Sequence, residues 1–147
     1  MKSLSSTQKA YIAGFLDGDG SIYVRMKPNS TYRYGFQIAP CIALFQSKKD
    51  ELKFEKIYSL IKLGNVRERN DGMIEYTIAR EGAIRLFLNE IQPFLILKSE
   101  QANLMIQILD AKSKIKTIDD FKALAQMIDM FRTLNYSKRR KHHILTP

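Results

Sequence analysis

A helical run of small and apolar residues ends in two aspartates that are set among glycines. The run spans residues 11–20 and reads YIAGFLDGDG. The C-terminal end of a helix carries partial negative charge, so the carboxylates of Asp17 and Asp19 are repelled there unless a positive charge lies close by. A divalent metal ion would supply that charge, because carboxylate oxygens and free carbonyls, such as that of Gly18, are hard ligands that Mg²⁺ accepts. The spacing therefore predicts a metal site, with a metal-free glycine turn stabilised by aspartates as the alternative.

The same helix carries small residues that could form a contact face. Gly14 and Gly18 lie four residues apart, and Ala10 and Ala13 extend the stripe. Because small side chains let two backbones come close together, this stripe predicts pairing with a second helix.

The chain is long enough for one ordinary domain with a sizeable core. It has 147 residues, of which 45% are hydrophobic. No apolar run is long enough to cross a membrane, and residues 1–6 lack the apolar core of a signal peptide. Cys41 is the only cysteine and has no partner for an internal disulfide, which fits a reducing compartment. We therefore expect a folded, soluble, intracellular protein that enters no membrane.

The chain is also strongly basic. Lysine and arginine together number 24 against 15 for aspartate and glutamate, which gives a formal charge of +9 and a pI of about 9.7. Such a balance indicates a polyanion as the partner. Many basic domains bind no nucleic acid, so the nucleic-acid interpretation depends on whether the positive side chains gather on one surface.

Local patterns predict the elements that position the aspartates. Residues 5–7 are candidate caps for a helix that runs to about Asp17, and residues 21–27 alternate with apolar residues at even positions. Turn and loop residues at 28–35 lead to a second strand over 36–45, which Pro40 is expected to interrupt with a bulge or bend. The residues of the second strand that we expect to face the core are Phe36, Ile38, Ile42 and Leu44.

A helix and a second hairpin follow. Residues 48–63 carry apolar residues at helical spacing, and Gly64 is placed to end the helix. Strands over 66–69 and 73–79 flank the turn at 70–72, a strong hairpin signal. The apolar residues of the helix are Leu52, Ile57, Leu60 and Ile61, and those on one face of the last strand are Ile74, Tyr76 and Ile78.

The rest of the chain is predicted to be helical up to a basic tail. Helices are expected over 81–91, where Pro93 follows the end, over 99–111, and over 117–134, which opens with a pattern like a capping box. The resulting order, αββαββα followed by further helices, indicates an α+β fold. The tail, residues 136–147, is too polar to pack and can be disordered.

Odd-numbered residues of the predicted strands face away from the core and are mostly polar with long side chains. Arginine and lysine pair with guanine edges, glutamine with adenine and glutamate with cytosine, and a two-stranded ribbon fits a major groove. A half-solvated antiparallel sheet has the same alternation and is the alternative. These residues include Tyr23, Arg25, Lys27, Gln37, Arg67, Arg69, Glu75 and Thr77.

Residues 11–20 closely resemble the signature of the LAGLIDADG homing endonucleases, with Tyr11 in place of the first leucine and Gly18 in place of the second alanine. The resemblance extends over almost the whole chain. It implies an αββαββα fold in which a curved four-stranded antiparallel sheet forms a DNA-binding saddle, followed by C-terminal helices. Residues 1–147 would then form a single endonuclease domain.

The same resemblance assigns the residues that contact double-stranded DNA. Ala39, Cys41 and Ala43 depart from the family's pattern, because their short side chains make few hydrogen bonds to bases, so water or apolar contacts would serve there. The expected DNA-binding residues are Tyr23, Arg25, Lys27, Asn29, Tyr32, Gln37, Arg67, Arg69, Glu75 and Thr77, with Ser137 and Lys138 in the tail.

The family's chemistry is metal-dependent phosphodiester hydrolysis, in which metal ions neutralise charge on both sides of the phosphorus. By resemblance Asp19 is the metal ligand, the Gly18 carbonyl assists it, and Asp17 supports the turn. The expected ion is Mg²⁺, and Mn²⁺ or Ca²⁺ can occupy the same site.

Two further segments, residues 45–47 and 92–104, resemble family segments. They imply that Gln46 orders the water network and that Lys98 is the basic residue near the scissile phosphate. Asp50 stands where a second basic residue is common, which leaves the third member of the catalytic pocket open.

One copy of the signature supplies half of the machinery for a double-strand break. We therefore infer a C2 homodimer whose helices pair across the axis. The resemblance then implies a long, pseudo-palindromic target that is cut to leave short 3′ overhangs. The residues expected on the paired helix are Ala10, Ala13, Gly14 and Asp17.

Other functions fit parts of the sequence. A non-cleaving DNA-binding regulator or an RNA maturase would use the same basic sheet, and a structural dimerisation module would use the small-residue stripe. Asp19, Gln46 and Lys98 together favour the nuclease, because a pure binding protein needs no ligand carboxylate beside a phosphate. The many isoleucines and lysines fit an A·T-rich genome, so we expect an organelle, chloroplast or mitochondrion, or an archaeal cytoplasm.

Overall fold

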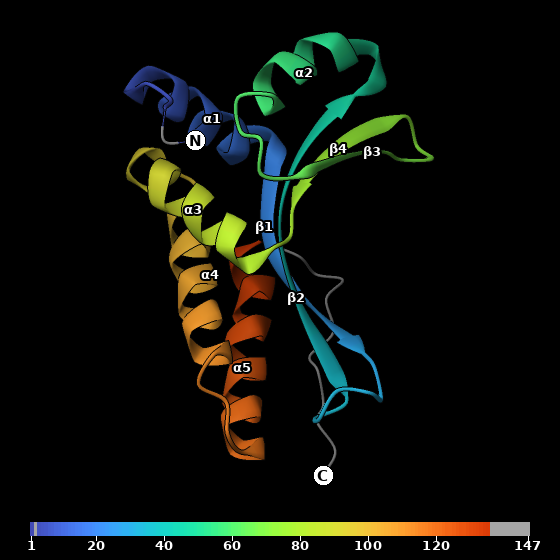
Figure 1. Cartoon of the computed structure of the whole chain (residues 1–147), viewed down its shortest axis with the longest axis vertical. Helices are drawn as coiled ribbons and strands as arrows, with labels where there is room; N and C mark the ends of the chain where they lie inside the picture. The colour runs from blue at the N-terminus through green and yellow to red at the C-terminus, as the bar shows by residue number, and fades with distance from the viewer. Residues whose placement is uncertain (2, 136–147) are drawn as a thin grey trace. The chain divides into compact units, whose positions relative to one another are not determined.

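A computed structural model describes Met1 and residues 3–135. The four strands pair in the order β1-β2-β4-β3, and β4 is antiparallel to both β2 and β3. This architecture confirms the predicted α+β class. The basic tail, with the predicted DNA contacts at Ser137 and Lys138, lies outside the described residues. The elements are, in chain order (Figure 1), α1 (Ser6–Asp19), β1 (Gly20–Pro28), β2 (Phe36–Ser47), η1 (Lys48–Asp50), α2 (Glu51–Tyr58), β3 (Asn65–Glu68), β4 (Met73–Ile78), α3 (Glu81–Ile91), η2 (Gln92–Phe94), α4 (Ser99–Lys112) and α5 (Ile118–Leu134).

The residues group into two compact units. The first unit contains Met1–Ile22 and Cys41–Ser99, and the second contains Tyr23–Pro40 and the chain from Glu100 onward. The prediction that residues 1–147 form a single domain stays a prediction.

Helix α1 of the first unit has the predicted N-terminal cap. The Ser5 hydroxyl accepts a hydrogen bond from the Gln8 N–H at 3.1 Å, and the Gln8 side chain accepts one from the Ser5 N–H at 2.9 Å. This capping box satisfies donors that a helix start leaves unpaired. At the other end, a Cβ added to Gly20 would lie 2.8 Å from the Leu16 carbonyl and 2.9 Å from the Ala43 carbonyl. The last glycine of the signature therefore allows the end of α1 to lie close against β2.

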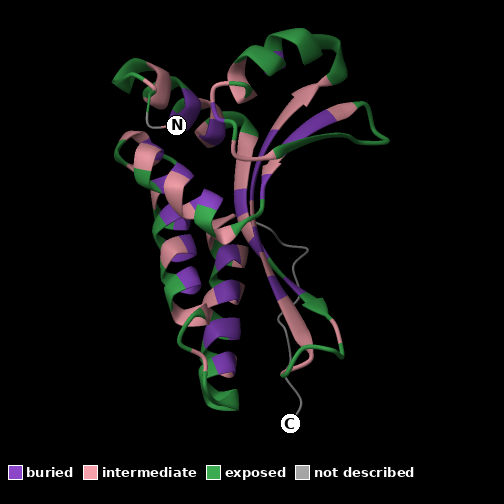
Figure 2. Ribbon diagram, in the orientation of Figure 1, coloured by how far each residue is buried: buried purple, intermediate pink, exposed green. Residues whose placement is uncertain are grey.

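The strands of the first unit follow the predicted alternation. Figure 2 shows buried residues recurring along β2 and β4, and Leu44 pairs with Tyr76 in the register of these strands. The turn after β3 contains Gly72 at φ 80°, as expected for the predicted hairpin. The buried residues of these strands that the sequence predicted are Ile42, Leu44, Ile74, Tyr76 and Ile78.

The helix predicted over residues 48–63 is wrong in its extent. A short 3₁₀ turn precedes α2, and the helix ends at Tyr58. Leu52 is 78% exposed, whereas Phe54 is buried and stacks on Phe15 at 5.7 Å. A helix of eight residues has too few turns for apolar spacing to fix which side faces the core.

Gly64 does not end α2, which corrects the second prediction for this segment. The Tyr76 hydroxyl accepts hydrogen bonds from the Leu63 N–H at 2.9 Å and the Gly64 N–H at 2.7 Å. A Cβ at Gly64 would overlap the Thr77 carbonyl. Glycine is needed here because the chain passes directly over β4.

Pro40 does not interrupt the second strand, and the bulge or bend predicted there stays a prediction. Strand β2 is continuous from Phe36 to Ser47. Pairing with β4 begins only at Ile42, so the missing N–H of Pro40 leaves no gap in that ladder.

The second unit holds the tip of β1 and β2 together with α4 and α5. Helix α5 opens with a capping box in which Thr117 and Asp120 bond to each other's backbone N–H groups, both at 3.1 Å. Hydrogen bonds from the Lys116 and Thr117 N–H groups lower the pKa of Asp120 below its ordinary value. Phe121 lies 5.0 Å from the Tyr34 ring and 6.3 Å from the Phe36 ring, which anchors the loop before β2.

Candidate active site

The carboxylate of Asp17, in the last turn of α1, is surrounded by hydrogen-bond donors. Oδ2 accepts from the N–H groups of Ile96 at 2.9 Å and Leu97 at 3.2 Å. Oδ1 accepts from the N–H of Lys98 at 3.0 Å. The expected support of the glycine turn is therefore corrected, because Asp17 holds the loop between η2 and α4 instead.

Lys98 also contacts the end of α1. Its Nζ donates to the main-chain carbonyl of Asp17 at 2.7 Å. The Lys98 ammonium group and three N–H donors thus compensate the negative charge of the Asp17 carboxylate and of the helix C-terminus. This aspartate needs no metal ion to be stable in its place.

Asp19 has very different surroundings. It is exposed at the last position of α1. Within Met1 and residues 3–135 its carboxylate makes no hydrogen bond and no ion pair. It lines a hollow of about 410 Å³ together with Ala10, Tyr11, Gly14, Phe15 and Gly18. Of the two carboxylates, Asp19 is the one available to a cation, and the carbonyls of the helix end lie beside it.

Gln46 lies near the end of β2 and is half-buried. Its Oε1 accepts a hydrogen bond from the Ser47 N–H at 2.9 Å, and it pairs with Ile74 in the register of β2 and β4. In the part of the chain that the structure describes, Gln46 bonds to neither Asp19 nor Lys98. The structure thus joins Asp17 to Lys98 directly and leaves Gln46 and Asp19 unlinked.

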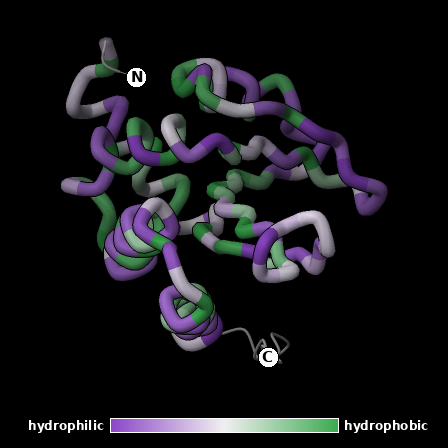
Figure 3. Tube along the Cα trace, turned by 60° about the horizontal axis from the view of Figure 1, so that its bottom comes forward, coloured by the Kyte–Doolittle hydropathy of each residue, from purple (hydrophilic) through white to green (hydrophobic). Residues whose placement is uncertain are grey.

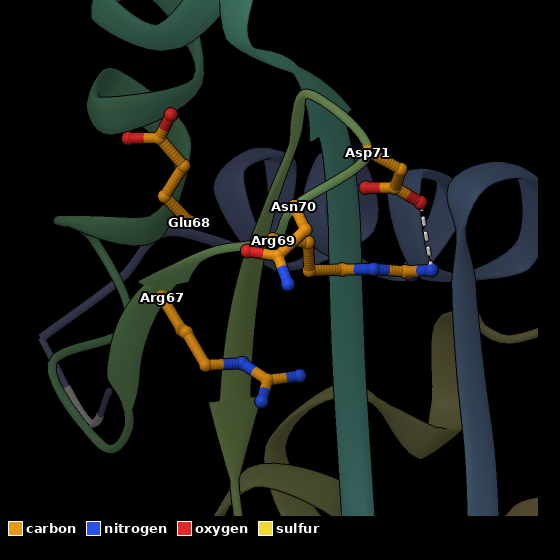
Figure 4. Close-up of a pocket in the computed structure, with 5 residues that line it drawn as sticks. All are labelled: Arg67, Glu68, Arg69, Asn70 and Asp71. Carbon is orange, nitrogen blue, oxygen red and sulfur yellow. Dashed lines mark ion pairs between the residues drawn. The ribbon is translucent and has the colours of Figure 1, made fainter.

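The polar residues of the β3–β4 hairpin form ion pairs. Arg67 contacts Glu75 at 2.7 Å and Arg69 contacts Asp71 at 2.9 Å, while the Arg69 guanidinium lies 5.8 Å from the centre of the Phe45 ring. Figure 4 shows the Arg67 and Arg69 side chains extending in the same direction from the hairpin. The residues of this hairpin end are strongly hydrophilic (Figure 3). They line a hollow of about 360 Å³ made by Arg67, Glu68, Arg69, Asn70 and Asp71.

Glu75, which the sequence predicts to face away from the core, is nevertheless buried. Its side chain is only 7% exposed, whereas that of Arg67 is 71% exposed. In the register of the strands Glu75 lies between Phe45 on β2 and Arg67 on β3, and these larger neighbours cover it. Thr77, the next outward residue of β4, is half-buried.

In the second unit the predicted DNA-binding residues lie on the β1–β2 tip. Arg25 and Lys27 are exposed, and the Arg25 guanidinium lies 5.1 Å from the centre of the Tyr23 ring. Asn29 is engaged within the loop, since its Oδ1 accepts from the Thr31 N–H at 3.0 Å and hydroxyl at 2.7 Å. The other two predicted residues here are Tyr32, which is 45% exposed, and Gln37, which is half-buried.

The predicted contact face of α1 is partly corrected. Ala10 and Gly14 are exposed, and a Cβ added to Gly14 or Gly18 would meet nothing within 4 Å. Ala13, in contrast, is fully buried in the core of its own chain. Successive residues of a helix point about 100° apart, so Ala13 faces inward while Gly14 faces outward.

A family model described as LAGLIDADG endonuclease matches residues 12–103. The chain belongs to the LAGLIDADG endonuclease family. DNA endonuclease I-CreI of Chlamydomonas reinhardtii is 35% identical over 132 residues, which cover 89% of this chain and 80% of I-CreI. DNA endonuclease I-CvuI of Chlorella vulgaris is 30% identical over 131 residues, which cover 89% of this chain and 81% of I-CvuI.

Solved structures of LAGLIDADG proteins share the fold. A crystal structure of the homing endonuclease I-CvuI in complex with the I-CreI target, in the presence of Mg, has a TM-score of 0.85 at 29% identity and covers 92% of this chain and 86% of its own. The archaeal intron-encoded homing endonuclease I-Vdi141I, complexed with DNA, has a TM-score of 0.79 at 20% identity and covers 95% and 90%, which shows the fold alone.

The described residues contain neither an acidic or histidine-rich metal cluster nor a membrane-spanning helix. Among Met1 and residues 3–135, no group of three or more histidine, cysteine, aspartate or glutamate residues could hold a metal ion. Over the same residues no helix is both long enough and apolar enough to span a membrane. The predicted compartment, an organelle or an archaeal cytoplasm, stays a prediction.

Proposed function

We propose that this LAGLIDADG protein is a site-specific homing endonuclease. As a homodimer it binds a long, pseudo-palindromic DNA target and hydrolyses one phosphodiester bond in each strand, leaving short 3′ overhangs. The observation that carries this proposal is the contrast between the two aspartates of α1. Asp17 accepts hydrogen bonds from three N–H groups, whereas Asp19 is exposed and has no partner among the residues that the structure describes. Family membership and two relatives named as DNA endonucleases support the same function.

The residues at the end of α1 fit a divalent cation. An exposed carboxylate that no described residue pairs with and an adjacent helix-end carbonyl are the hard oxygen donors that Mg²⁺ takes while it keeps waters and phosphates as its other ligands. Asp19 and the Gly18 carbonyl would hold the ion, which supplies charge neutralisation at the phosphate and an activated water. I-CvuI was crystallised with DNA in the presence of Mg and of Ca, which supports a divalent metal. We assign Mg²⁺ as the working ion and Mn²⁺ or Ca²⁺ as other occupants.

Lys98 is placed to hold a phosphate oxygen. Its ammonium group has three donors, of which the hydrogen bond to the Asp17 carbonyl uses one. The main-chain N–H of Lys98 is fixed by the Asp17 carboxylate, so the whole residue is tied to the helix that carries Asp19. We assign Lys98 the stabilisation of negative charge on the scissile phosphate.

Gln46 is assigned the ordering of water. Its Oε1 is engaged by the Ser47 N–H, while the two donors of its amide nitrogen remain for a water molecule. Asp50 forms an ion pair with Lys53 at 3.7 Å. The pair therefore keeps the Lys53 ammonium group next to Asp50, the position where the family commonly has a second basic residue.

The DNA contacts are assigned to the outward residues of both units. In the first unit these are Arg67, Arg69 and Thr77, with the buried Glu75 as the carboxylate partner that orients Arg67, and in the second unit Tyr23, Arg25, Lys27, Asn29, Tyr32 and Gln37. Arginine and lysine supply phosphate and guanine contacts, and the polar side chains supply base-edge hydrogen bonds.

Replacing Asp19→Asn tests the assignment of the cation ligand. The amide keeps the size of the side chain but removes the negative charge, so we expect cleavage of a selected target with Mg²⁺ to slow by at least about 100-fold. Binding to the same duplex should persist, because one negative charge less near the phosphates does not weaken it. Asp119→Asn, an exposed aspartate in the first turn of α5, is the matched control and should cut normally.

The experiment begins with selection of bound sequences from a randomised duplex library, followed by incubation with Mg²⁺. Binding without any linear product from the wild-type protein would favour the non-cleaving regulator. Cleavage by the Asp19→Asn protein at the wild-type rate would remove Asp19 from the site.

A further inference from the structure

The loop between β1 and β2, residues 29–35 of the second unit, is closed by its own hydrogen bonds. The Asn29 N–H donates to the Gly35 carbonyl at 2.9 Å, and the Gly35 N–H donates to the Tyr32 carbonyl at 3.0 Å. The Asn29 side chain accepts two further hydrogen bonds from Thr31. These bonds fix the shape of the loop, but they join loop residues to one another and to no helix. The direction in which the loop points therefore depends on other contacts.

A buried aromatic side chain of α5 supplies such a contact. Phe121 is 3% exposed, and its ring centre lies 5.0 Å from that of Tyr34 and 6.3 Å from that of Phe36, with both pairs stacked. The start of α5 is ordered by the capping box of Thr117, whose carbonyl also accepts a hydrogen bond from the Phe121 N–H at 3.2 Å. The ordered start of a helix thus packs against the end of the loop and the first residue of β2.

The packing beside these rings is incomplete. A hollow of about 270 Å³ borders the three rings, and its lining includes Tyr32, Gln37, Lys112 and Ile115. Side chains along a hollow lack neighbours on one side and lose the attraction that close packing would give them. The stacked rings therefore carry a large share of the support of the loop, and without the ring of Phe121 the loop has room to move into the hollow.

We propose that Phe121 is a positioning residue for sequence recognition, which holds Tyr32 against its base pair without touching DNA itself. The inference rests on the proposed function, because it takes Tyr32 as a DNA-contacting residue. Tyr32 is 45% exposed and stands two residues before Tyr34, so a movement of the stacked ring also displaces Tyr32. Hydrogen bonds weaken steeply when their distance and angle change. A small displacement of the loop therefore lowers discrimination at the base pairs that it contacts and nowhere else in the target.

The first test is Phe121→Leu in the full chain, measured by competition between a selected target and its single base-pair variants. Tyr32→Ala identifies the base pairs that the loop reads. At those base pairs Phe121→Leu should lower discrimination by about 10-fold, as expected for one lost base contact. Discrimination at the base pairs read by Arg67 on β3 should be unchanged. The salt dependence of binding should also be unchanged, because the substitution removes no cation.

Phe131→Leu is the matched control for folding effects. Phe131 is a fully buried phenylalanine of the same helix, but it lies ten residues further along α5. This spacing places it about 15 Å from Phe121 along the helix axis. The substitution should lower the free energy of unfolding as Phe121→Leu does, because both remove a buried ring. It should leave discrimination unchanged at every base pair.

Two substitutions of Tyr34 test the stacked ring from the side of the loop. The hydroxyl of Tyr34 is buried and bonds to no residue that the structure describes. Tyr34→Phe therefore keeps the ring and should leave discrimination unchanged. Tyr34→Leu removes the ring and should lower discrimination at the same base pairs as Phe121→Leu.

Limited proteolysis with trypsin follows the loop without DNA. Arg33 is exposed, and it is the only lysine or arginine in residues 28–47. The first cut after Arg33 should be about five-fold faster in Phe121→Leu than in Phe131→Leu, because a loop that has lost its anchor opens locally more often. Equal rates in the two variants would contradict the anchoring role of Phe121.

The outcomes distinguish this inference from the proposed function. A wild-type protein that binds no DNA contradicts the proposed function and, with it, the role of Phe121 in recognition. A protein that binds and cuts its target, but whose discrimination is the same in Phe121→Leu as in the wild type, overturns this inference alone. A loss of discrimination that is spread evenly over the target, or that Phe131→Leu shares, also overturns it. If Phe121→Leu does not fold, Tyr34→Leu provides the same test.

Discussion

The positively charged side chains of the two units have different neighbours. On the β3–β4 hairpin of the first unit, Arg67 is paired with Glu75 and Arg69 with Asp71. On β1 in the second unit, Arg25 and Lys27 are exposed, and within the described residues neither contacts a carboxylate. The same residue types are thus neutralised locally in one unit and left with their full charge in the other.

This difference in neighbours gives the two units different roles in binding DNA: one in affinity, the other in discrimination between sequences. A cation without a protein partner gains the full attraction of a phosphate and releases counterions when it binds. An arginine that already holds a carboxylate gains less from a phosphate, but its guanidinium is oriented by the pair and can be aimed at a base edge. We therefore expect β1 to supply salt-dependent affinity and the β3–β4 hairpin to supply sequence discrimination.

Register explains why the pairs form where they do. Arg67 lies directly opposite Glu75, and Phe45 lies opposite Glu75 on the other side. Directly opposed residues on antiparallel strands have close Cβ atoms, so a long arginine covers a shorter glutamate. Lys27 lies near the end of β1. The loop that follows, residues 29–35, contains no acidic residue, and its Asn29 side chain bonds within the loop itself.

The largest effect on stability is expected for Arg67→Met. The substitution leaves the buried Glu75 carboxylate without its partner, and we expect the free energy of unfolding to fall by about 1–2 kcal/mol. The solvent exposure of Arg67 keeps this below the effect of a fully buried pair. Denaturant unfolding measures it.

The double variant Arg67→Met with Glu75→Gln is the control. Removing both charges should recover most of the lost stability, because no buried carboxylate remains uncompensated. Equal stability of the single and double variants would show that the pair is not coupled. On DNA, the double variant should lose discrimination at the contacted base pair by about 1–3 kcal/mol, as measured by competition between target sequences.

For Lys27→Met we expect a smaller effect, on the salt dependence of DNA binding and not on stability. Lys27 has no carboxylate partner among the residues described, so stability should not change. The slope of log binding constant against log salt concentration should flatten by about 0.9, the value for one phosphate contact. The Arg67→Met, Glu75→Gln variant should leave the slope unchanged, because it removes a neutral pair. Similar slopes for both variants would contradict the assignment of salt-dependent affinity to β1 and of sequence discrimination to the β3–β4 hairpin.

Short-range features of this protein were predictable from the sequence. The Ser5 and Thr117 caps and the hairpin turn at 70–72 depend on residues within a few positions of each other, and all three occur as predicted. The alternation of apolar residues likewise predicted the buried face of β4. Such patterns report local geometry directly, which is why the α+β class followed from them.

Long-range contacts were not predictable in the same way. The donors around Asp17 come from residues 79 to 81 positions later in the chain, so the signature alone could not reveal why this aspartate is present. Position along β4 indicates that Glu75 faces outward, but its burial depends on neighbours on two other strands. Four apolar residues stand between Pro93 and Lys98, of which Leu95 is buried while Ile96 and Leu97 are exposed, and apolarity alone does not predict which of them face the core.

The smallest effect is expected at the exposed pair of Lys48 and Glu68, whose Nζ and Oε1 lie 2.6 Å apart. The hydrogen bond and charge of Glu68 raise the pKa of Lys48 above its ordinary value of 10.5. Because the pKa is higher in the folded state, the pair stabilises the protein fully below pH 10.5, and this stabilisation is lost as the pH rises through the pKa of the folded state. Glu68→Gln should therefore lower the denaturation midpoint slightly at pH 7 and make no difference once Lys48 is neutral. A difference that persists in strongly alkaline solution would mean that Glu68 acts through packing and not through its charge. The pair would then differ in kind from the charge-neutralised arginines of the β3–β4 hairpin, on which Glu68 lies.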